Sequence, residues 1–334
     1  MSTKQFQHFQ HAHCESGVTS NLLRHEGIEI SEPLAFGIGA GLFFAHMPFI
    51  KVSGAPGTSF RSLPGSIFKR VTKSLGIEVH TQRFGSPQKA MVALDEVLDT
   101  GKPVGMLSSV YYLPYLPEAF RFHFNAHNLI SYGRQDGLYN ISDPVLEEVT
   151  TISYDDLAKA RFAKGTPEPR GFMYYVKNAP ADIDFKKAIE KGIKKNCYLM
   201  LSPPLPWFGV NAIFHLAKKI KQYPAKLTPR KAQLYLGNII RMQEEIGTGG
   251  AGFRFLYAAF LQEASEILQR DDLKGFAEEL TAIGDEWRNF AYSAARLMKE
   301  RKSDLVSYDE LSALLYSCAV KEKDFFKRLD QLKW

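Results

Sequence analysis

Cysteine is scarce in this chain of 334 residues, which contains only Cys14, Cys197 and Cys318. Three scattered cysteines are too few for a disulfide framework, and an odd number leaves at least one of them unpaired. Residues 1–16 are polar and rich in His and Gln, without the apolar stretch of a secretory signal. These absences predict a protein of a reducing compartment, and we expect it in the cytoplasm.

Long apolar runs are also lacking. Residues 33–50 (PLAFGIGAGLFFAHMPFI) carry no charged side chain and reach the lower edge of membrane-spanning length. Three glycines, a histidine and two prolines lower the helix propensity of this stretch, and its glycines lack the spacing of a dinucleotide-binding loop. We expect buried, irregular backbone near a cleft, in a protein that does not bind membranes.

Charge of one sign is not concentrated anywhere in the sequence. The net charge of +6 arises from basic residues spread along the chain, and no arginine-rich stripe interleaves with aromatic residues. This distribution argues against nucleic acid as a partner. Mild lysine clusters, such as residues 218–221, suit an acidic partner such as an acyl carrier protein, because opposite charge steers encounter. For any single cluster, a solvated helix face is the simpler explanation.

The two halves of the chain have different patterns. Up to about residue 144, short β-type runs and Gly or Pro breaks surround one or two helices, which we expect directly after Cys14 and over 88–99. After the break SPPLPW, helical periodicity predicts long helices over 210–222, 229–245, 253–269, 273–300 and 308–332. Thr228 before Pro229, and Ser307 three residues before Glu310, are typical of helix caps. The sequence predicts an α/β domain over 1–150 and a mainly α-helical domain over 151–334.

Cys14 stands directly before the first helical pattern. The positive end of a helix dipole stabilises a thiolate, and the N–H groups there can face a developing oxyanion. Cys197 and Cys318 lie among apolar neighbours instead. Cys14 is therefore the best candidate for a reactive cysteine, although on its own a buried structural cysteine is the commoner finding.

Residues 126–144 (AHNLISYGRQDGLYNISDP) predict a β-hairpin, because two alternating runs flank an Asp-Gly turn signal. If Gln135 is the centre of the turn, His127 and Asp143 are equally far from it and face each other across the strands. A slip of one residue would put them on opposite faces. A histidine oriented by an aspartate is what a cysteine nucleophile requires, so we predict a Cys14–His127–Asp143 triad.

These motifs resemble known families. Cys at a helix start, His at a strand start and Asp on the next strand follow the order of papain-like cysteine enzymes. The runs HNLISYG and DGLYNISDP resemble the His and Asp strands of double-glycine peptidases that process bacteriocins. HCESGVTSNLLRHEGIEISEPLAFGIGAGLFF resembles the N-terminal domain of butirosin biosynthesis protein H (BtrH), and EEIGTGGAGFRFLYAAFLQEAS with Trp287 resembles its helical C-terminal domain. The resemblance covers nearly the whole chain and implies a papain-like domain with an antiparallel sheet, followed by a helical domain.

The resemblance to BtrH implies an acyltransferase of antibiotic or other secondary-metabolite biosynthesis. Such an enzyme takes an acyl group from a carrier-protein or CoA thioester and passes it to a small amine, which in BtrH-like proteins is an aminoglycoside. Carried onto this chain, Cys14 is the nucleophile, His127 the general base and later acid, and Asp143 the orienting carboxylate. No cofactor is implied beyond the phosphopantetheine of the carrier protein, which is part of the donor substrate.

Other residues are weaker candidates. Papain-like enzymes place a Gln a few residues before the Cys for the oxyanion hole, and Gln10 is our choice for that role. His13 and Glu15 flank Cys14 and are candidates for tuning its pKa or orienting substrate, while Arg254 at a helix start is a candidate for contacting an anionic group. For His13 and Glu15 an exposed polar residue without a role is an equally good explanation, and for Arg254 an ordinary surface arginine is the better one. The N-terminal histidines and Cys14 have no second ligand cluster, so we expect no metal.

Two other function classes stay open. A peptidase or amidase uses the same triad with water in place of the amine, because pocket shape and water exclusion choose the acceptor. A non-catalytic binding protein could carry a decayed triad. The sequence does not determine the acyl group, the acceptor or whether the chain forms a homo-oligomer.

Overall fold

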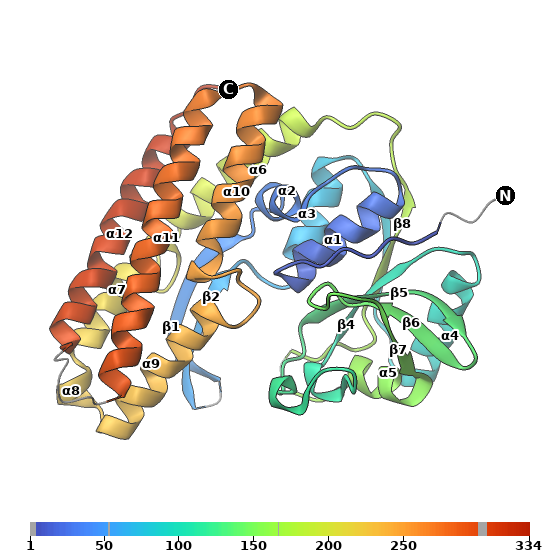
Figure 1. Ribbon diagram of the computed structural model, residues 1–334, viewed down its shortest axis with the longest axis horizontal. Coiled ribbons are helices and arrows are strands. Elements are labelled where there is room, and N and C mark those ends of the chain that lie inside the picture. The colour runs from blue at the N-terminus through green and yellow to red at the C-terminus, as the bar shows by residue number, and fades with distance from the viewer. Residues whose placement is uncertain (1–4, 53, 166, 300–305) are drawn as a thin grey trace. The chain divides into compact units, whose positions relative to one another are not determined.

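The computed structural model describes residues 5–52, 54–165, 167–299 and 306–334 (Figure 1). The chain forms two compact units. The first comprises the chain up to Ala35 and Ile67–Asp184, and the second comprises Phe36–Ser66 and Phe185–Trp334. The units therefore interleave along the sequence, because residues 36–66 leave the first unit and join the second. This division differs from the predicted boundary after residue 150. That boundary was predicted between domains that fold independently, and it stays a prediction.

The first unit is built on a six-stranded sheet in which all paired strands are antiparallel, with the order β3-β8-β4-β5-β6-β7. The strands are β3 (Glu78–Gln82), β4 (Val104–Ser108), β5 (His127–Gln135), β6 (Leu138–Ser142), β7 (Thr150–Ser153) and β8 (Met173–Asn178). The helices are α1 (Cys14–His25), α4 (Pro87–Leu98), α5 (Tyr154–Arg161), nearly all of α3 (Ser66–Ser74) and the start of α2 (Glu32–Ile38), with the short turns η1 (Val110–Tyr112) and η2 (Glu118–Phe120).

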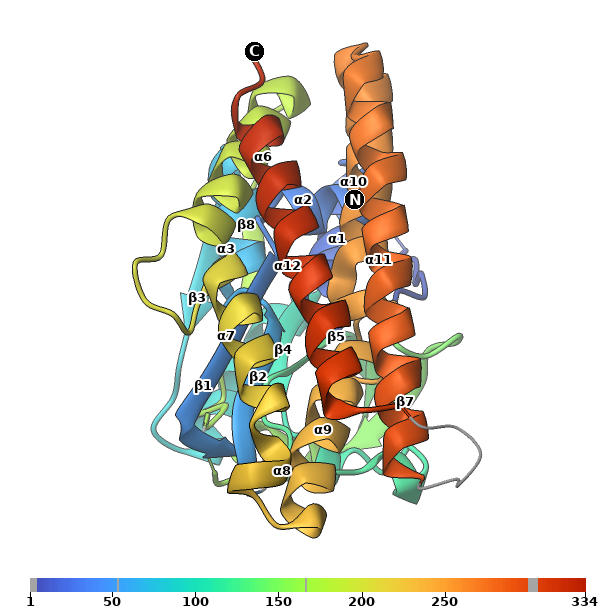
Figure 2. The same ribbon diagram turned by 90° about the vertical axis from the view of Figure 1, so that its left-hand side faces the viewer.

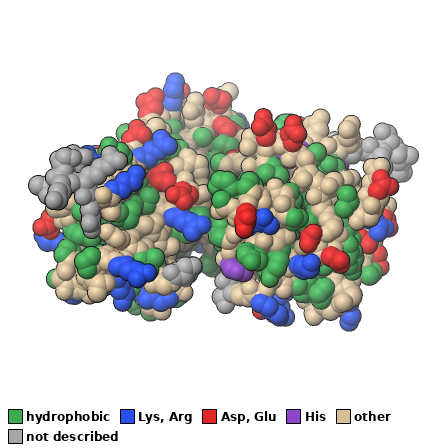
Figure 3. Space-filling view, turned by 60° about the horizontal axis from the view of Figure 1, so that its bottom comes forward, with side chains coloured by type: hydrophobic (Ala, Val, Ile, Leu, Met, Phe, Trp, Pro, Cys, Tyr) green, Lys and Arg blue, Asp and Glu red, His purple; other side chains and the backbone are tan. Residues whose placement is uncertain are grey.

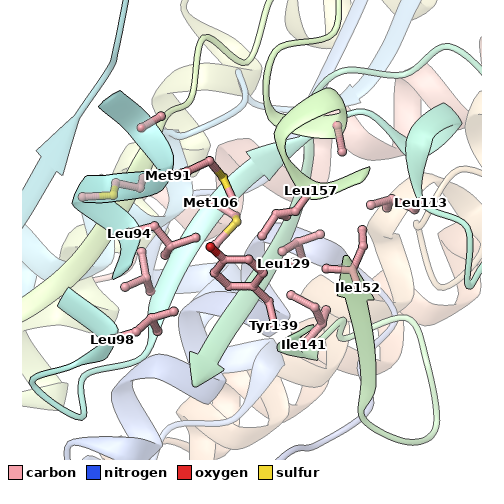
Figure 4. Packing of buried hydrophobic residues seen from close by; sticks show 14 of the residues in the cluster. Met91, Leu94, Leu98, Met106, Leu113, Leu129, Tyr139, Ile141, Ile152 and Leu157 are labelled. Atoms are coloured by element: carbon pink, nitrogen blue, oxygen red, sulfur yellow. The ribbon is translucent and has the colours of Figure 1, made fainter. Parts of the chain in front are cut away.

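Helices cover both faces of this sheet. On one face, α4 and α5 pack on a cluster that includes Leu94, Leu129 and Ile141 (Figure 4). On the other face, α1 packs on β5 through a smaller cluster that includes Ile130 and Tyr174. Successive residues of β5 thus enter different clusters, as the alternation of side chains along a strand requires. Because α1 packs on β5, the alternation of side chains along β5 determines which of them lie near the N-terminus of α1.

The second unit joins a long hairpin to a set of helices. The hairpin consists of β1 (Leu42–Val52) and β2 (Ala55–Arg61). The helices are α6 (Phe185–Leu201), α7 (Gly209–Lys221), α8 (Tyr223–Lys226), α9 (Pro229–Glu244), the turn η3 (Ala251–Phe253), α10 (Arg254–Leu268), α11 (Asp271–Met298) and α12 (Tyr308–Asp330). Figure 2 shows α11 lying beside α10 and α12, while α7 and α9 pack against the hairpin.

The predicted class, an α/β region with an antiparallel sheet followed by a helical region, is confirmed. The five long helices predicted after SPPLPW correspond to α7 and α9–α12 and end within a couple of residues of the predicted positions, apart from residue 300, which lies outside the described residues. Thr228 caps α9 by accepting from the Lys231 N–H, and Ser307 and Glu310 form a capping box at α12. The local signals were sufficient here because caps act within one helical turn.

The expectation of irregular backbone over residues 33–50 was wrong. The stretch forms helix α2 and strand β1, joined at a short turn. Its glycines serve close packing: a Cβ on Gly37 would lie 2.0 Å from Cγ of Phe260, and a Cβ on Gly192 of α6 would lie 2.6 Å from the Gly37 carbonyl oxygen. Within the described residues, no helix is both long enough and apolar enough to cross a membrane.

Charged side chains of both signs are interspersed with hydrophobic ones on the face that Figure 3 shows. The positive net charge is therefore not gathered into one basic field on this face. The arrangement agrees with the spread of Lys and Arg along the sequence.

Candidate active site

Cys14 is the first residue of α1 and is 7% exposed. His13 caps the helix, because its side chain accepts a hydrogen bond from the Ser16 N–H. The buried Glu32 carboxylate accepts from the N–H groups of Ala12 (2.9 Å) and His13 (2.7 Å) and from the Ser16 hydroxyl (3.1 Å). These bonds fix the backbone that enters the helix, and with it the position of the Cys14 side chain.

The N-terminal segment is held against the chain that follows β6. The His11 N–H donates to the Pro144 carbonyl at 2.6 Å. His8 donates from Nε2 to the Leu146 carbonyl (3.1 Å), and its Nδ1 accepts from the Ser142 hydroxyl (2.8 Å). Gly17 permits this approach, because a Cβ there would lie 2.7 Å from the Cβ atoms of both His11 and Pro144. The segment thereby brings the start of α1 next to the end of β6.

The predicted hairpin exists, but its predicted register was wrong. Its turn lies at Asp136 and Gly137, both with positive φ, so that Gln135 pairs with Leu138. Between Gly133 and Ser131 the register shifts by one residue. In the resulting register Asp143 lies diagonally from His127 on the same face, where long side chains still meet. Without the shift the two would lie on opposite faces, so a local bulge that the sequence did not reveal brings them together.

His127 and Asp143 form a short, buried hydrogen bond. Nε2 of His127 lies 2.7 Å from Oδ2 of Asp143, and the two residues are 5% and 0% exposed. The same oxygen accepts from the Tyr115 hydroxyl at 2.9 Å, while Oδ1 accepts from the Val145 N–H at 3.3 Å. A carboxylate held by these donors acts as the acceptor, so His127 donates from Nε2. Its Nδ1 is therefore the ring nitrogen that does not bond to Asp143, and the Cys14 side chain is the second polar contact of the ring.

The charges of this cluster favour a protonated imidazole. Burial opposes the charge of His127, but the Asp143 carboxylate and a contact with the Cys14 side chain outweigh it and raise the pKa of His127 from 6.5 to about 10. Burial and the neighbouring Asp143 charge raise the pKa of Tyr115 well above 10, so its hydroxyl remains a donor to Asp143. Both neighbours of the imidazole ring, Asp143 and Cys14, thus favour its protonated form.

The other cysteines have different surroundings. None of the three cysteines is in a disulfide, but Cys197 and Cys318 are fully buried in the helical unit. Burial is the main cause that raises their pKa well above that of an ordinary thiol. Both therefore remain protonated at neutral pH, when a thiol is a poor nucleophile.

Sequence reasoning missed Asn128 and Tyr174. Nδ2 of Asn128 lies 3.9 Å from Sγ of Cys14, and the Tyr174 hydroxyl donates to Oδ1 of Asn128 at 2.7 Å. Asn128 directly follows His127, but a strand sends neighbouring side chains to opposite faces, and nothing in the pattern indicated that both reach Cys14. Tyr174 comes from β8, whose pairing with β4 was not predicted.

The weaker candidates have other contacts. Gln10 is exposed, and its predicted oxyanion role stays a prediction. His13 is the cap of α1, and Oε1 of the buried Glu15 accepts from the Ile67 N–H (2.8 Å), at the start of α3. Both residues thus fix the backbone around Cys14. Their predicted effects on the Cys14 pKa or on substrate stay predictions.

Arg254 is not a surface residue. It is fully buried and forms a two-pronged ion pair with Glu322, at 2.8 and 2.9 Å, with its guanidinium 4.6 Å from the Trp287 ring centre. The Trp287 indole N–H donates to the same carboxylate. These contacts give Arg254 a structural role within the helical unit, and its predicted contact with an anionic group stays a prediction.

The N-terminal histidines are used separately. Among the described residues, no three His, Cys, Asp or Glu side chains are grouped so that they could hold a metal ion. His11 donates to Oδ1 of Asn21 at 3.0 Å, while His8 and His13 have the partners given above.

Comparison with known proteins identifies both parts of the chain. Residues 13–144 match the N-terminal domain of butirosin biosynthesis protein H, and residues 155–329 match the domain of unknown function DUF4872. A solved structure from Bacillus anthracis, described as a C39-like peptidase, is 17% identical with a TM-score of 0.38 and covers 53% of this chain and 97% of its own. A likeness of this size says nothing about the reaction. No curated protein matches the chain.

Proposed function

We propose that this chain, which belongs to the DUF4872 family and begins with a domain of the butirosin biosynthesis protein H type, is a cysteine acyltransferase. The observation that carries the proposal is the buried Nε2–Oδ2 bond of His127 and Asp143 beside Cys14, the first residue of a helix. A thiolate next to an imidazolium is an activated nucleophile, and such a nucleophile serves acyl transfer. The match to a protein of butirosin biosynthesis supports a role in making a secondary metabolite.

The first half of the reaction is acylation of Cys14. The thiolate adds to the carbonyl carbon of an acyl thioester, and the carbonyl electrons move to oxygen to form a tetrahedral oxyanion. When this intermediate collapses, the bond to the leaving sulfur breaks, and the leaving thiolate takes the proton from Nδ1 of His127. Asp143 holds the imidazole in place throughout, and the acyl group remains on Cys14.

The second half passes the acyl group to an amine. The amine nitrogen attacks the acyl-Cys14 carbonyl while Nδ1 of His127, now neutral, takes its proton. Collapse of the second tetrahedral intermediate forms the amide and expels the Cys14 thiolate, which again pairs with the imidazolium. The donor is the thioester of a carrier protein or of CoA, and the acceptor is a small amine such as an aminoglycoside.

Acylation of Cys14 tests the proposal directly. The protein is incubated with acyl thioesters of CoA and of N-acetylcysteamine, quenched, and digested, and the mass of the Cys14 peptide is measured. Wild type should gain one acyl group on Cys14, and added aminoglycoside should remove it as an amide. Cys14→Ala should gain none, whereas Cys197→Ala should behave as wild type.

Two outcomes contradict the transferase. Release of the free acid at one rate, whether or not amine is present, indicates a hydrolase with the same triad. Absence of any acyl-Cys14 in wild type indicates a protein that does not use this cysteine as a nucleophile, and then a binding role takes the place of catalysis.

A further inference from the structure

The proposed reaction builds a negative oxygen next to Cys14, and an amide side chain lies at that place. We propose that Nδ2 of Asn128 donates the hydrogen bond that stabilises the oxyanion, and that the Tyr174 hydroxyl is the positioning residue that orients the amide. The inference rests on the proposed acyl transfer and goes beyond it, because it assigns the stabilising donor to Asn128, which sequence reasoning did not single out.

The orientation of the Asn128 amide follows from its neighbours. Nδ2 lies 3.3 Å from the Ala126 carbonyl oxygen, which only accepts hydrogen bonds, so the NH₂ group is on that side. Oδ1 then faces the Tyr174 hydroxyl, which donates to it at 2.7 Å. Asn128 and Tyr174 are 1% and 2% exposed, so water does not compete for these bonds. The amide is therefore held with its nitrogen toward Cys14.

The distance to the sulfur suits a donor that acts in the transition state. One N–H of Asn128 faces the Ala126 carbonyl, and the other is available toward Sγ of Cys14 at 3.9 Å, which is a long and weak contact. In the tetrahedral intermediate the oxyanion is on the carbon bonded to Sγ, and we place it on the side of that carbon that faces Nδ2 of Asn128. A donor that contacts sulfur weakly and oxygen closely stabilises the transition state more than the resting enzyme, which is what accelerates a reaction.

The sheet separates this donor from the base. His127 lies on the face of β5 that carries Leu129, with Asp143 beside it, whereas Asn128 lies on the face that carries Ile130, under α1. Both still contact Cys14, one through the imidazole and the other through the amide. Proton transfer and oxyanion stabilisation are thus assigned to side chains from different faces of β5.

Comparing two reactions of Cys14, alkylation and acylation, distinguishes an oxyanion-stabilising role of Asn128 from a purely structural role. Alkylation by iodoacetamide displaces iodide from a saturated carbon and forms no oxyanion, whereas acylation by a thioester forms one. We expect Asn128→Ala to slow single-turnover acylation about 100- to 1,000-fold, as removal of one oxyanion donor does elsewhere. Its alkylation rate should stay within about threefold of wild type, because the His127–Asp143 pair is untouched.

Tyr174→Phe gives an independent measurement with a gentler change. It removes the hydroxyl that orients the amide, so acylation should slow by about tenfold while alkylation is kept. Tyr139→Phe is the matched control: it removes a hydroxyl that donates to Asp95 at 2.7 Å in the same unit, and should change neither rate. Equal losses of acylation and alkylation, or unchanged acylation in Asn128→Ala, would overturn the assignment while the proposed function stands. Absence of acylation in wild type itself overturns both.

Discussion

In the proposed mechanism, the positive charge of His127 keeps Cys14 ionised. The substitution Asp143→Asn tests this effect, because it removes the carboxylate that favours the charge. The pKa of His127 rises from 6.5 to about 10 because Asp143 and Cys14 together outweigh burial. This difference corresponds to roughly 5 kcal/mol in favour of the charged ring, at about 1.4 kcal/mol per pKa unit. At pH 7.5, which is well below this pKa, the protonated ring predominates.

Asparagine keeps the shape of Asp143 and removes its charge. Burial is then no longer opposed by the carboxylate, so we expect the pKa of His127 to fall to 6.5 or below and the ring to be mostly neutral at pH 7.5. A cysteine without a cationic partner titrates near pH 8.5, so only roughly a tenth of it is thiolate at pH 7.5. The alkylation rate of Cys14 should fall about tenfold at pH 7.5 and approach that of wild type above about pH 9.

The assay is the rate of iodoacetamide alkylation at Cys14 between pH 5.5 and 10, read by peptide mass spectrometry. Cys197 and Cys318 in the same digest report any loss of the fold, since both are buried and should stay unmodified. Asp95→Asn is the matched control, because Asp95 also accepts from a tyrosine hydroxyl, at 2.7 Å, but lies away from Cys14 on α4. The same pH profile for wild type and Asp143→Asn would refute the reasoning.

The raised pKa also predicts how stability depends on pH. Because the pKa of His127 is higher in the folded state than in the unfolded state, the contribution of its charge is complete below about pH 6.5 and is lost as the pH rises through about 10. Wild type should therefore lose more unfolding free energy than His127→Gln over this range, as measured by urea denaturation. If wild type and His127→Gln lost the same unfolding free energy over this pH range, the predicted contribution of the His127 charge would be wrong.

Four further substitutions test the packing inside each unit. Gly17→Ala places a Cβ 2.7 Å from two neighbouring carbons. It should therefore lower the free energy of unfolding by about 1–3 kcal/mol and slow Cys14 alkylation, because α1 is displaced. An unchanged alkylation rate would show that the helix start tolerates the shift. Glu322→Ala leaves the buried charge of Arg254 without its carboxylate and should cost about 3–5 kcal/mol in urea unfolding, and a loss below about 1 kcal/mol would argue against the buried pair. Gly252→Ala should lower the free energy of unfolding by more than about 2 kcal/mol, because φ is +57° and the new Cβ would lie 2.1 Å from an aromatic carbon. Gly275→Ala, in an open position of α11, should raise it by about 0.5–1 kcal/mol. The reverse order of the two melting temperatures would refute the packing argument.

Local features of this protein were readable in the sequence. The long helices of the second unit, the caps at Thr228 and Ser307 and the start of α1 at Cys14 depend on contacts within a few residues, so their patterns predict them closely. The hairpin was also recognisable, because an Asp-Gly turn between alternating runs is a local signal.

What the sequence did not determine depends on contacts between distant segments. The transfer of residues 36–66 into the helical unit and the burial of Arg254 against Glu322 have no signature in a periodicity pattern. The register shift between Ser131 and Gly133 brings His127 and Asp143 together. The alternating pattern predicts the two strands but not this one-residue shift in their pairing.

The sequence by itself determined that a cysteine begins the first helix and that a histidine and an aspartate flank one hairpin. Only the tertiary structure decided that these three meet, because hydrogen bonds from His8 and His11 to the chain beyond β6 hold the start of α1 there. It also decided that an amide from β5, oriented by a hydroxyl from β8, lies beside the sulfur. Such a site is made of side chains up to 160 positions apart in the chain, and hydrogen bonds, strand pairing and packing between distant segments set their distances.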